Sequence, residues 1–190
     1  MVDYAELRRG KPSANVLWGN EATVLVGDFL LARSFLNLVQ DEDLKILGCI
    51  SYATTKMAEG EILQLLKTEE PETTEEEYLE IVKCKTAVLI SAAAEAGAII
   101  GKTTQENTKR MKDFGMLIGI AFQIADDTLD YIEEDKTLGK TKGQDFYDGK
   151  VTMPFIYTYS KATEKEKKLL SRLLVKKNKK HEDFQKVYSL

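Results

Sequence analysis

The chain has 190 residues, a formal net charge of −4, 43% hydrophobic residues and 31% charged residues. This composition excludes an intrinsically disordered chain, and the length suits one domain with a hydrophobic core. A nucleic-acid partner is not expected, because the chain has neither an overall positive charge nor a basic stripe interleaved with aromatic residues.

Segments with apolar residues at helical spacing make up most of the chain. This spacing predicts helices at 20–39, 42–67, 74–101, 104–132, 151–161 and 164–176. No Asn-Gly or Asp-Gly hairpin signal joins two alternating segments. The sequence therefore predicts an all-α helical bundle, and the small residues of 92–98 suit close helix packing around a central cavity.

Three further features concern a predicted loop, membrane crossing and the two cysteines. Residues 133–150, rich in glycine and lysine, predict an ordered polar loop, and no helix signal closes the lysine-rich segment after 165. No transmembrane segment is expected, because the longest nearly apolar run, 114–125, is too short to cross a bilayer. Cys49 and Cys84 follow no metal-ligand spacing and favour core thiols in the reducing cytoplasm.

Three acidic residues end the predicted helix 104–132, after an almost entirely apolar approach in GIAFQIADDTLD (119–130). On a helix, Asp126 and Asp130 are four residues apart and share one face, and Asp127 is three residues from Asp130. Gln123 lies one turn earlier on the same side. The spacing predicts three carboxylates and an amide projecting toward one point.

Such a cluster is unfavourable without a cation, because like charges repel and the C-terminal end of a helix is already negative. Oxygen ligands without histidine or cysteine favour Mg²⁺, which commonly takes one or two carboxylates plus phosphate oxygens. The cluster therefore predicts a diphosphate bridged to the protein by Mg²⁺. A solvated acidic helix end is the alternative, although the apolar approach argues against it, and the loop pattern of a calcium EF-hand is absent.

Basic residues that could bind a diphosphate lie near the N-terminus, within the helix 74–101 and after the acids. They are Arg8, Arg9, Lys85, Lys140, Lys142 and Lys150. Each could instead be an ordinary surface residue. A lysine among apolar helix positions, such as Lys85, nevertheless needs a partner or an anion.

Together these features resemble the trans-isoprenyl diphosphate synthases, and among them the long-chain, octaprenyl-like polyprenyl type. The second DDxxD motif of that family is matched by FQIADDTLD (122–130). Further segments match in order and spacing: LRRGKPSAN (7–15), GNEATVLVGDFLLARSF (19–35), AEGEILQL (58–65), KTAVLISAAAEAGA (85–98) and GKTKGQDFYDGKVTMPFI (139–156).

The resemblance implies a helical bundle of the isoprenoid synthase type. It also implies a transferase that condenses an allylic diphosphate with isopentenyl diphosphate to make an all-trans polyprenyl diphosphate. Mg²⁺ would be held by Asp3, Asp126, Asp127 and Asp130. The catalytic residues would be Lys85, Gln123 and Asp126. Substrate binding would use Arg8, Arg9, Lys85, Thr86, Gln123, Lys140 and Lys150.

The chain departs from the family at its N-terminus, where residues 1–3 would supply only the last positions of the first DDxxD motif. Residues 1–190 are therefore interpreted as a single, partial isoprenoid synthase domain, shortened at both ends. Its uncovered apolar faces are expected to meet a second copy in a homodimer or a complementing N-terminal chain. Two other hypotheses stay open: a catalytically deficient subunit that binds or regulates a complete synthase, and a bundle with a structural divalent site.

Overall fold

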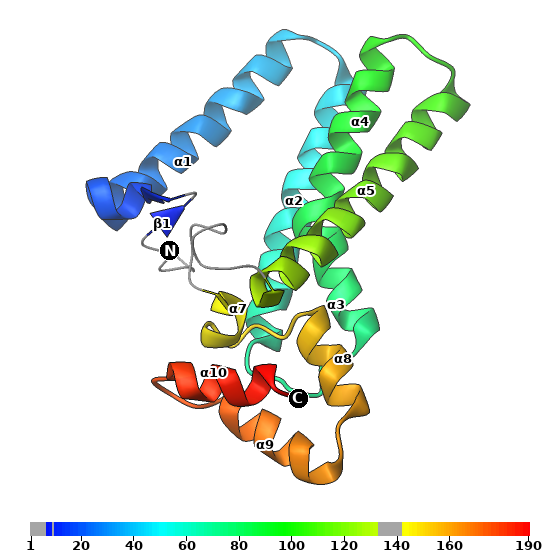
Figure 1. Ribbon diagram of the computed structural model, residues 1–190. Coiled ribbons are helices and arrows are strands. Elements are labelled where there is room, and N and C mark those ends of the chain that lie inside the picture. Colours follow the sequence, from blue (N-terminus) through cyan, green and yellow to red (C-terminus); the bar gives the residue numbers. More distant parts are fainter. Residues whose placement is uncertain (1–6, 9, 133–141) are drawn as a thin grey trace.

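The computed structural model describes residues 7–8, 10–132 and 142–190, and this part of the chain is almost entirely helical (Figure 1). The prediction of an all-α chain is confirmed. A short hairpin, which the sequence analysis missed, pairs β1 (Leu7–Arg8) antiparallel with β2 (Lys11–Pro12). Gly10 lies in its turn with a φ of 71°, a backbone conformation that glycine adopts without strain.

The first two helices form a V in Figure 1. α1 (Ala14–Gln40) is kinked at Gly19, whose φ is 79°, and α2 (Leu44–Lys67) follows after a short turn. The carboxylate of Asp43 caps α2 by accepting hydrogen bonds from the backbone amides of Lys45 at 2.8 Å and Ile46 at 3.3 Å. Because α1 diverges from α2 in this arrangement, none of the residues of α1 is buried.

α1 presents an apolar surface to solvent. Its exposed large side chains are Val16, Leu17, Trp18, Val24, Leu25, Val26, Phe29, Leu30, Leu31, Leu36 and Val39. By its length and by the mean hydropathy of 1.5 in its most apolar 18-residue stretch, α1 could cross a membrane, which the sequence analysis did not consider. One such helix is weak evidence for a membrane span, and Glu21, Asp28 and Arg33 interrupt its apolar character.

The helix expected at 74–101 is present, but its middle turn is not α-helical. α3 (Glu75–Val82) continues into a π-helical turn, η1 (Lys83–Ala87), and then into α4 (Val88–Ile100). A π turn is a wider turn with i→i+5 hydrogen bonds, and such turns occur frequently at functional sites. Apolar spacing could not reveal it, because one wide turn leaves the overall helical periodicity almost unchanged.

α5 (Gln105–Ile132) lies beside α4, with α2 on the other side of α4 (Figure 1). Between these helices is a small apolar cluster of Ala53, Val88 and Ala92. Short side chains allow the helix axes to approach closely. α5 carries Gln123 and the three acidic residues, and η1, between α3 and α4, carries Lys85 and Thr86.

The main core lies at the other end of the molecule, under α7 (Gln144–Tyr147), α8 (Met153–Lys161), α9 (Glu164–Leu174) and α10 (His181–Tyr188). Its fully buried large apolar side chains are Phe146, Phe155, Phe184, Leu170 and Leu174. The prediction of a polar loop is therefore wrong for residues 142–150, where Phe146 is 0% exposed. α10 was missed because its few apolar residues are dispersed among charges.

Asp183 holds the N-terminal end of α10, and this contact predicts an acid-sensitive part of the stability. Its carboxylate accepts hydrogen bonds from Lys176 Nζ at 2.6 Å and from the backbone amide of Lys180 at 2.8 Å. These two hydrogen bonds, Lys176 first, lower the pKa of Asp183. Because the folded pKa lies below the unfolded value of about 3.9, this stabilisation is full above that value and is lost as pH falls through the folded pKa.

We therefore expect Asp183→Asn to lower the free energy of unfolding at neutral pH and to flatten its decline in acid. Urea unfolding between about pH 6 and about pH 2 measures both effects. Glu182→Gln, at an exposed neighbouring position, is the matched control. An Asp183→Asn variant that declines in acid as steeply as the wild type would contradict the assignment.

Candidate functional site

The three acidic residues at the end of α5 have different environments. Asp126 is exposed, whereas Asp127 is 6% exposed and Asp130 is 0% exposed. The carboxylate of Asp130 accepts a hydrogen bond from the backbone amide of Asp145 at 3.0 Å, and its carbonyl accepts one from the amide of Gly143 at 2.8 Å. Asp130 therefore ties the last turn of α5 to α7.

Asp127 points toward α3. Its carboxylate accepts hydrogen bonds from the hydroxyl of Tyr78 and from Gln123 Nε2, each at 2.7 Å. Burial raises the pKa of Asp127, and the two donors partly offset that rise by favouring the carboxylate. Burial, followed by the negative charge of Asp127, also raises the pKa of Tyr78, so its hydroxyl remains a donor at neutral pH.

The expectation that three carboxylates project toward one point is wrong for these side chains. Within residues 10–132 and 142–190, no group of three histidine, cysteine, aspartate or glutamate side chains is arranged to hold a metal ion. Asp126 still fits Mg²⁺, because this ion keeps several waters and commonly takes only one or two carboxylates. Metal binding by Asp126, Asp127 and Asp130 therefore stays a prediction, with Asp126 the exposed member.

The predicted substrate-binding residues Lys85 and Thr86 lie in the π turn η1, each with a partner on a different helix. Lys85 Nζ lies 2.8 Å from the carboxylate of Glu61 and donates a hydrogen bond to Gln64 Oε1, both on α2. Thr86 Oγ1 donates to Gln123 Oε1 on α5 at 2.8 Å. The requirement that Lys85 has a partner is met here by an ion pair.

A continuous series of hydrogen bonds joins Thr86, Gln123, Asp127 and Tyr78. Gln123 accepts at Oε1 and donates at Nε2, so its amide is held in one orientation. Tyr78 and Glu61 were missed by the sequence analysis. Local spacing could not have identified Tyr78, because 49 residues separate it from Asp127.

The remaining predicted residues divide into two groups. Lys150 Nζ lies 3.1 Å from the carboxylate of Asp148 and 3.6 Å from that of Asp145, so Lys150 lies beside the segment that covers Asp130. Asp3, Arg9, Lys140 and the side chain of Arg8 lie outside the described residues. Their predicted roles stay predictions.

Tyr78→Phe is expected to lower the free energy of unfolding by about 1.5–3 kcal/mol, the usual contribution of a hydrogen bond to a charged group. Phenylalanine keeps the ring packing and removes only the hydroxyl that donates to buried Asp127. Urea unfolding at neutral pH measures the loss, with Tyr157→Phe, whose side chain is 65% exposed, as the control. Equal stability of the two variants would show that the Tyr78–Asp127 bond contributes nothing.

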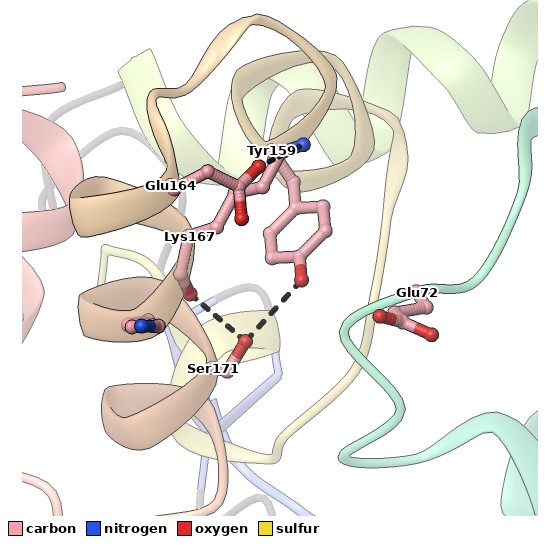
Figure 2. Close-up of a pocket in the computed structure, with 6 residues that line it drawn as sticks. Glu72, Tyr159, Glu164, Lys167 and Ser171 are labelled. Carbon is pink, nitrogen blue, oxygen red and sulfur yellow. Dashed lines mark hydrogen bonds and ion pairs between the residues drawn. The ribbon is translucent and has the colours of Figure 1, made fainter.

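A hollow of about 490 Å³ lies elsewhere, between α8, α9 and the connection from α2 to α3 (Figure 2). Ser171 and Tyr159 point toward each other in it: Ser171 Oγ donates to the carbonyl of Lys167 at 2.9 Å and lies 3.5 Å from Tyr159 Oη. The other lining residues are Glu72, Glu164 and Lys168. No predicted site residue lines this hollow, and the expected central cavity stays a prediction.

Curated proteins of similar sequence include octaprenyl and nonaprenyl diphosphate synthases as well as short-chain isoprenyl and geranylgeranyl diphosphate synthases. Octaprenyl diphosphate synthase of Escherichia coli (strain K12) is 39% identical over 181 residues, which are 95% of this chain and 56% of that protein. All-trans-nonaprenyl-diphosphate synthase (geranyl-diphosphate specific) of Rhodobacter capsulatus is 43% identical over 173 residues, which are 90% of this chain and 53% of that protein. The chain thus spans a little over half the length of these relatives.

Solved structures of such synthases share the fold. The polyprenyl synthase from Caulobacter crescentus CB15, complexed with calcium and isoprenyl diphosphate, superposes with a TM-score of 0.94 at 38% identity over 99% of this chain and 57% of that chain. A decaprenyl diphosphate synthase from Rhodobacter capsulatus gives 0.91 at 40% identity over 99% and 58%. The all-α isoprenoid synthase fold is thereby confirmed. A family model described as polyprenyl synthetase matches residues 1–190, and the chain belongs to that family.

Proposed function

We propose that this chain acts in a prenyltransferase that condenses an allylic diphosphate with isopentenyl diphosphate to form an all-trans polyprenyl diphosphate. One observation carries the proposal: consecutive hydrogen bonds join Thr86 of η1 through Gln123 to Asp127 at the acidic end of α5, and Lys85 precedes Thr86 in η1. Family membership supports the same chemistry, since the matched relatives include proteins named as octaprenyl and all-trans-nonaprenyl diphosphate synthases.

The described residues have different roles in binding the diphosphate and in orienting the side chains that contact it. Lys85 contributes a positive charge for diphosphate oxygens, and its pairing with Glu61 and Gln64 limits where that charge can move. Thr86 and Gln123 orient each other through their hydrogen bond, and Asp127 orients Gln123 by accepting a hydrogen bond from its Nε2. Asp126 would hold Mg²⁺, which when bound would neutralise the leaving diphosphate. The similar Caulobacter synthase is complexed with calcium, which supports the use of a divalent cation.

The partner of the apolar α1 surface is proposed to be a second copy of this chain, in a homodimer. Eleven large apolar side chains of α1 are exposed, and large exposed apolar patches commonly mark sites of protein–protein interaction. A complementing N-terminal chain is the alternative partner. We also infer a cytoplasmic location, because Cys49 and Cys84 are both free thiols.

An incubation with substrates tests the activity. The purified chain is mixed with Mg²⁺, farnesyl diphosphate and labelled isopentenyl diphosphate, with and without a polypeptide carrying a complete first DDxxD motif. Labelled prenyl products are expected in the mixture with that polypeptide. Absence of both product and Mg²⁺-dependent binding of farnesyl diphosphate would contradict the proposal.

The second candidate function is a catalytically deficient subunit of a complete synthase. It is favoured by one observation, that Asp127 and Asp130 are buried and accept hydrogen bonds from Tyr78 and from the backbone amide of Asp145. Binding of farnesyl diphosphate without product under every condition would support this subunit. Product from the chain alone would exclude it.

A further inference from the structure

The π turn η1 lies between two glycines on neighbouring helices. A Cβ atom on Gly60 of α2 would lie 2.6 Å from the backbone nitrogen of Lys85 and 2.8 Å from Cβ of Cys84. A Cβ atom on Gly119 of α5 would lie 2.5 Å from Cα of Ala87. These distances are shorter than ordinary van der Waals contacts, so any larger residue would displace η1 or one of the helices.

Each of these glycines is followed four residues later by a glutamine that binds η1. The segments are GEILQ (60–64) and GIAFQ (119–123). Residues four apart on a helix share a face, so backbone approach and side-chain contact occur on the same side. Gln64 Oε1 accepts a hydrogen bond from Lys85 Nζ, and Gln123 Oε1 accepts one from Thr86 Oγ1 at 2.8 Å. Two helices thus use the same Gly-x-x-x-Gln arrangement on consecutive residues of η1.

We propose that Gly60 and Gly119 are positioning residues for Lys85 and Thr86. Each glycine sets the distance between its helix and η1 at which the following glutamine reaches its partner. A π turn is rare and persists where its surroundings hold it, and backbone contact on both sides provides such support. The inference rests on the proposed function, in which Lys85 and Thr86 bind the diphosphate.

Two further glycines provide matched controls. Gly48 also lies in α2, and a Cβ atom there would meet nothing within 4 Å. Gly115 also lies in α5, and a Cβ atom there would lie 2.8 Å from both the carbonyl oxygen of Ile90 and Cα of Ser91. Gly115→Ala therefore crowds α4 outside the π turn, which separates general crowding of the helices from displacement of η1.

The first measurement is the acetylation rate of Lys85 by a lysine-reactive ester, followed by mass spectrometry without any substrate. Gly60→Ala is expected to raise this rate several-fold, because Nζ loses its contacts with Glu61 and Gln64. Gly48→Ala and Gly115→Ala are expected to leave the acetylation rate of Lys85 unchanged. This holds for Gly115→Ala even if that substitution lowers the melting temperature. An unchanged rate in a folded Gly60→Ala variant would overturn the inference.

The second measurement is the protection of Lys85 from acetylation by inorganic pyrophosphate with Mg²⁺. Gly60→Ala and Gly119→Ala are expected to raise the half-protecting concentration at least tenfold, and Gly115→Ala less than twofold. Equal values for Gly119→Ala and Gly115→Ala would overturn the inference for Gly119. If the wild type shows no protection, the proposed function fails, and the acetylation rate without pyrophosphate still decides the inference for Gly60.

Glutamine variants keep the proposal falsifiable if the alanine variants do not fold. Gln64→Met preserves side-chain length, leaves the close approach at Gly60 unchanged and removes the acceptor of Lys85. It is expected to raise the acetylation rate of Lys85 several-fold at an unchanged melting temperature. Gln123→Met is expected to raise the half-protecting concentration of pyrophosphate. Wild-type values in both variants would overturn the proposed arrangement.

Discussion

Asp126→Asn is expected to weaken Mg²⁺-dependent binding of pyrophosphate at least tenfold, or by about 1.4 kcal/mol. Asp126 is the only exposed member of the acidic trio, whereas Asp127 and Asp130 are buried and accept hydrogen bonds from other elements. An amide in place of the carboxylate removes the negative charge that attracts the cation. Titration calorimetry of pyrophosphate at a fixed Mg²⁺ concentration measures the change.

Asp113→Asn is the matched control, because Asp113 is also an exposed aspartate on α5. It removes the same charge from the same helix, and its affinity for pyrophosphate is expected to stay within twofold of the wild type. The same loss in both variants would indicate a general electrostatic effect. Equal affinity of Asp126→Asn and the wild type would remove Asp126 from the metal site.

Phe146→Ala is expected to lower the free energy of unfolding by about 3–5 kcal/mol, the usual range for a buried phenylalanine. Phe146 is 0% exposed, and its ring centroid lies 5.7 Å from that of Tyr147 and 6.0 Å from that of Phe184. Removal of the ring leaves a cavity in the cluster that joins α7 to α10. Urea unfolding of the purified chain at neutral pH measures the loss.

Tyr157→Ala, on an exposed position of α8, provides the comparison for Phe146→Ala. Surface substitutions usually change stability by no more than about 0.5 kcal/mol. A similarly small effect of Phe146→Ala would show that α7 does not belong to the core, as expected for the polar loop predicted at 133–150. A large effect would establish that α7 belongs to the core next to the C-terminal end of α5.

The long helices were predictable because their evidence is local. Apolar residues recur at helical spacing in α2 and α5, and the observed bounds, Leu44–Lys67 and Gln105–Ile132, differ from the expected ones by two residues or fewer. α10 was not predictable in this way. Phe184 and Val187 are the only buried apolar residues of α10, and the charged residues around them do not indicate the aromatic partners contributed by α7.

The candidate site was predicted in part for the same reason. Lys85, Thr86 and Gln123 could be singled out from residue type and family resemblance, and the structure places them in hydrogen-bonded contact with neighbouring helices. Their partners Glu61 and Tyr78 could not be singled out. Contact between helices depends on how whole elements pack, and single-sequence periodicity contains no information about which face meets which neighbour.

The sequence by itself determined that Asp126, Asp127 and Asp130 end an amphipathic helix, because helix geometry depends on residues close in the chain. Only the tertiary structure decided that Asp127 contacts Tyr78 of α3 and that the amide of Asp145 binds Asp130, while Asp126 stays exposed. The physical reason is that the segments covering each side of α5 come from distant parts of the chain. Spacing sets the direction of a side chain relative to its own helix, and packing sets what that side chain meets.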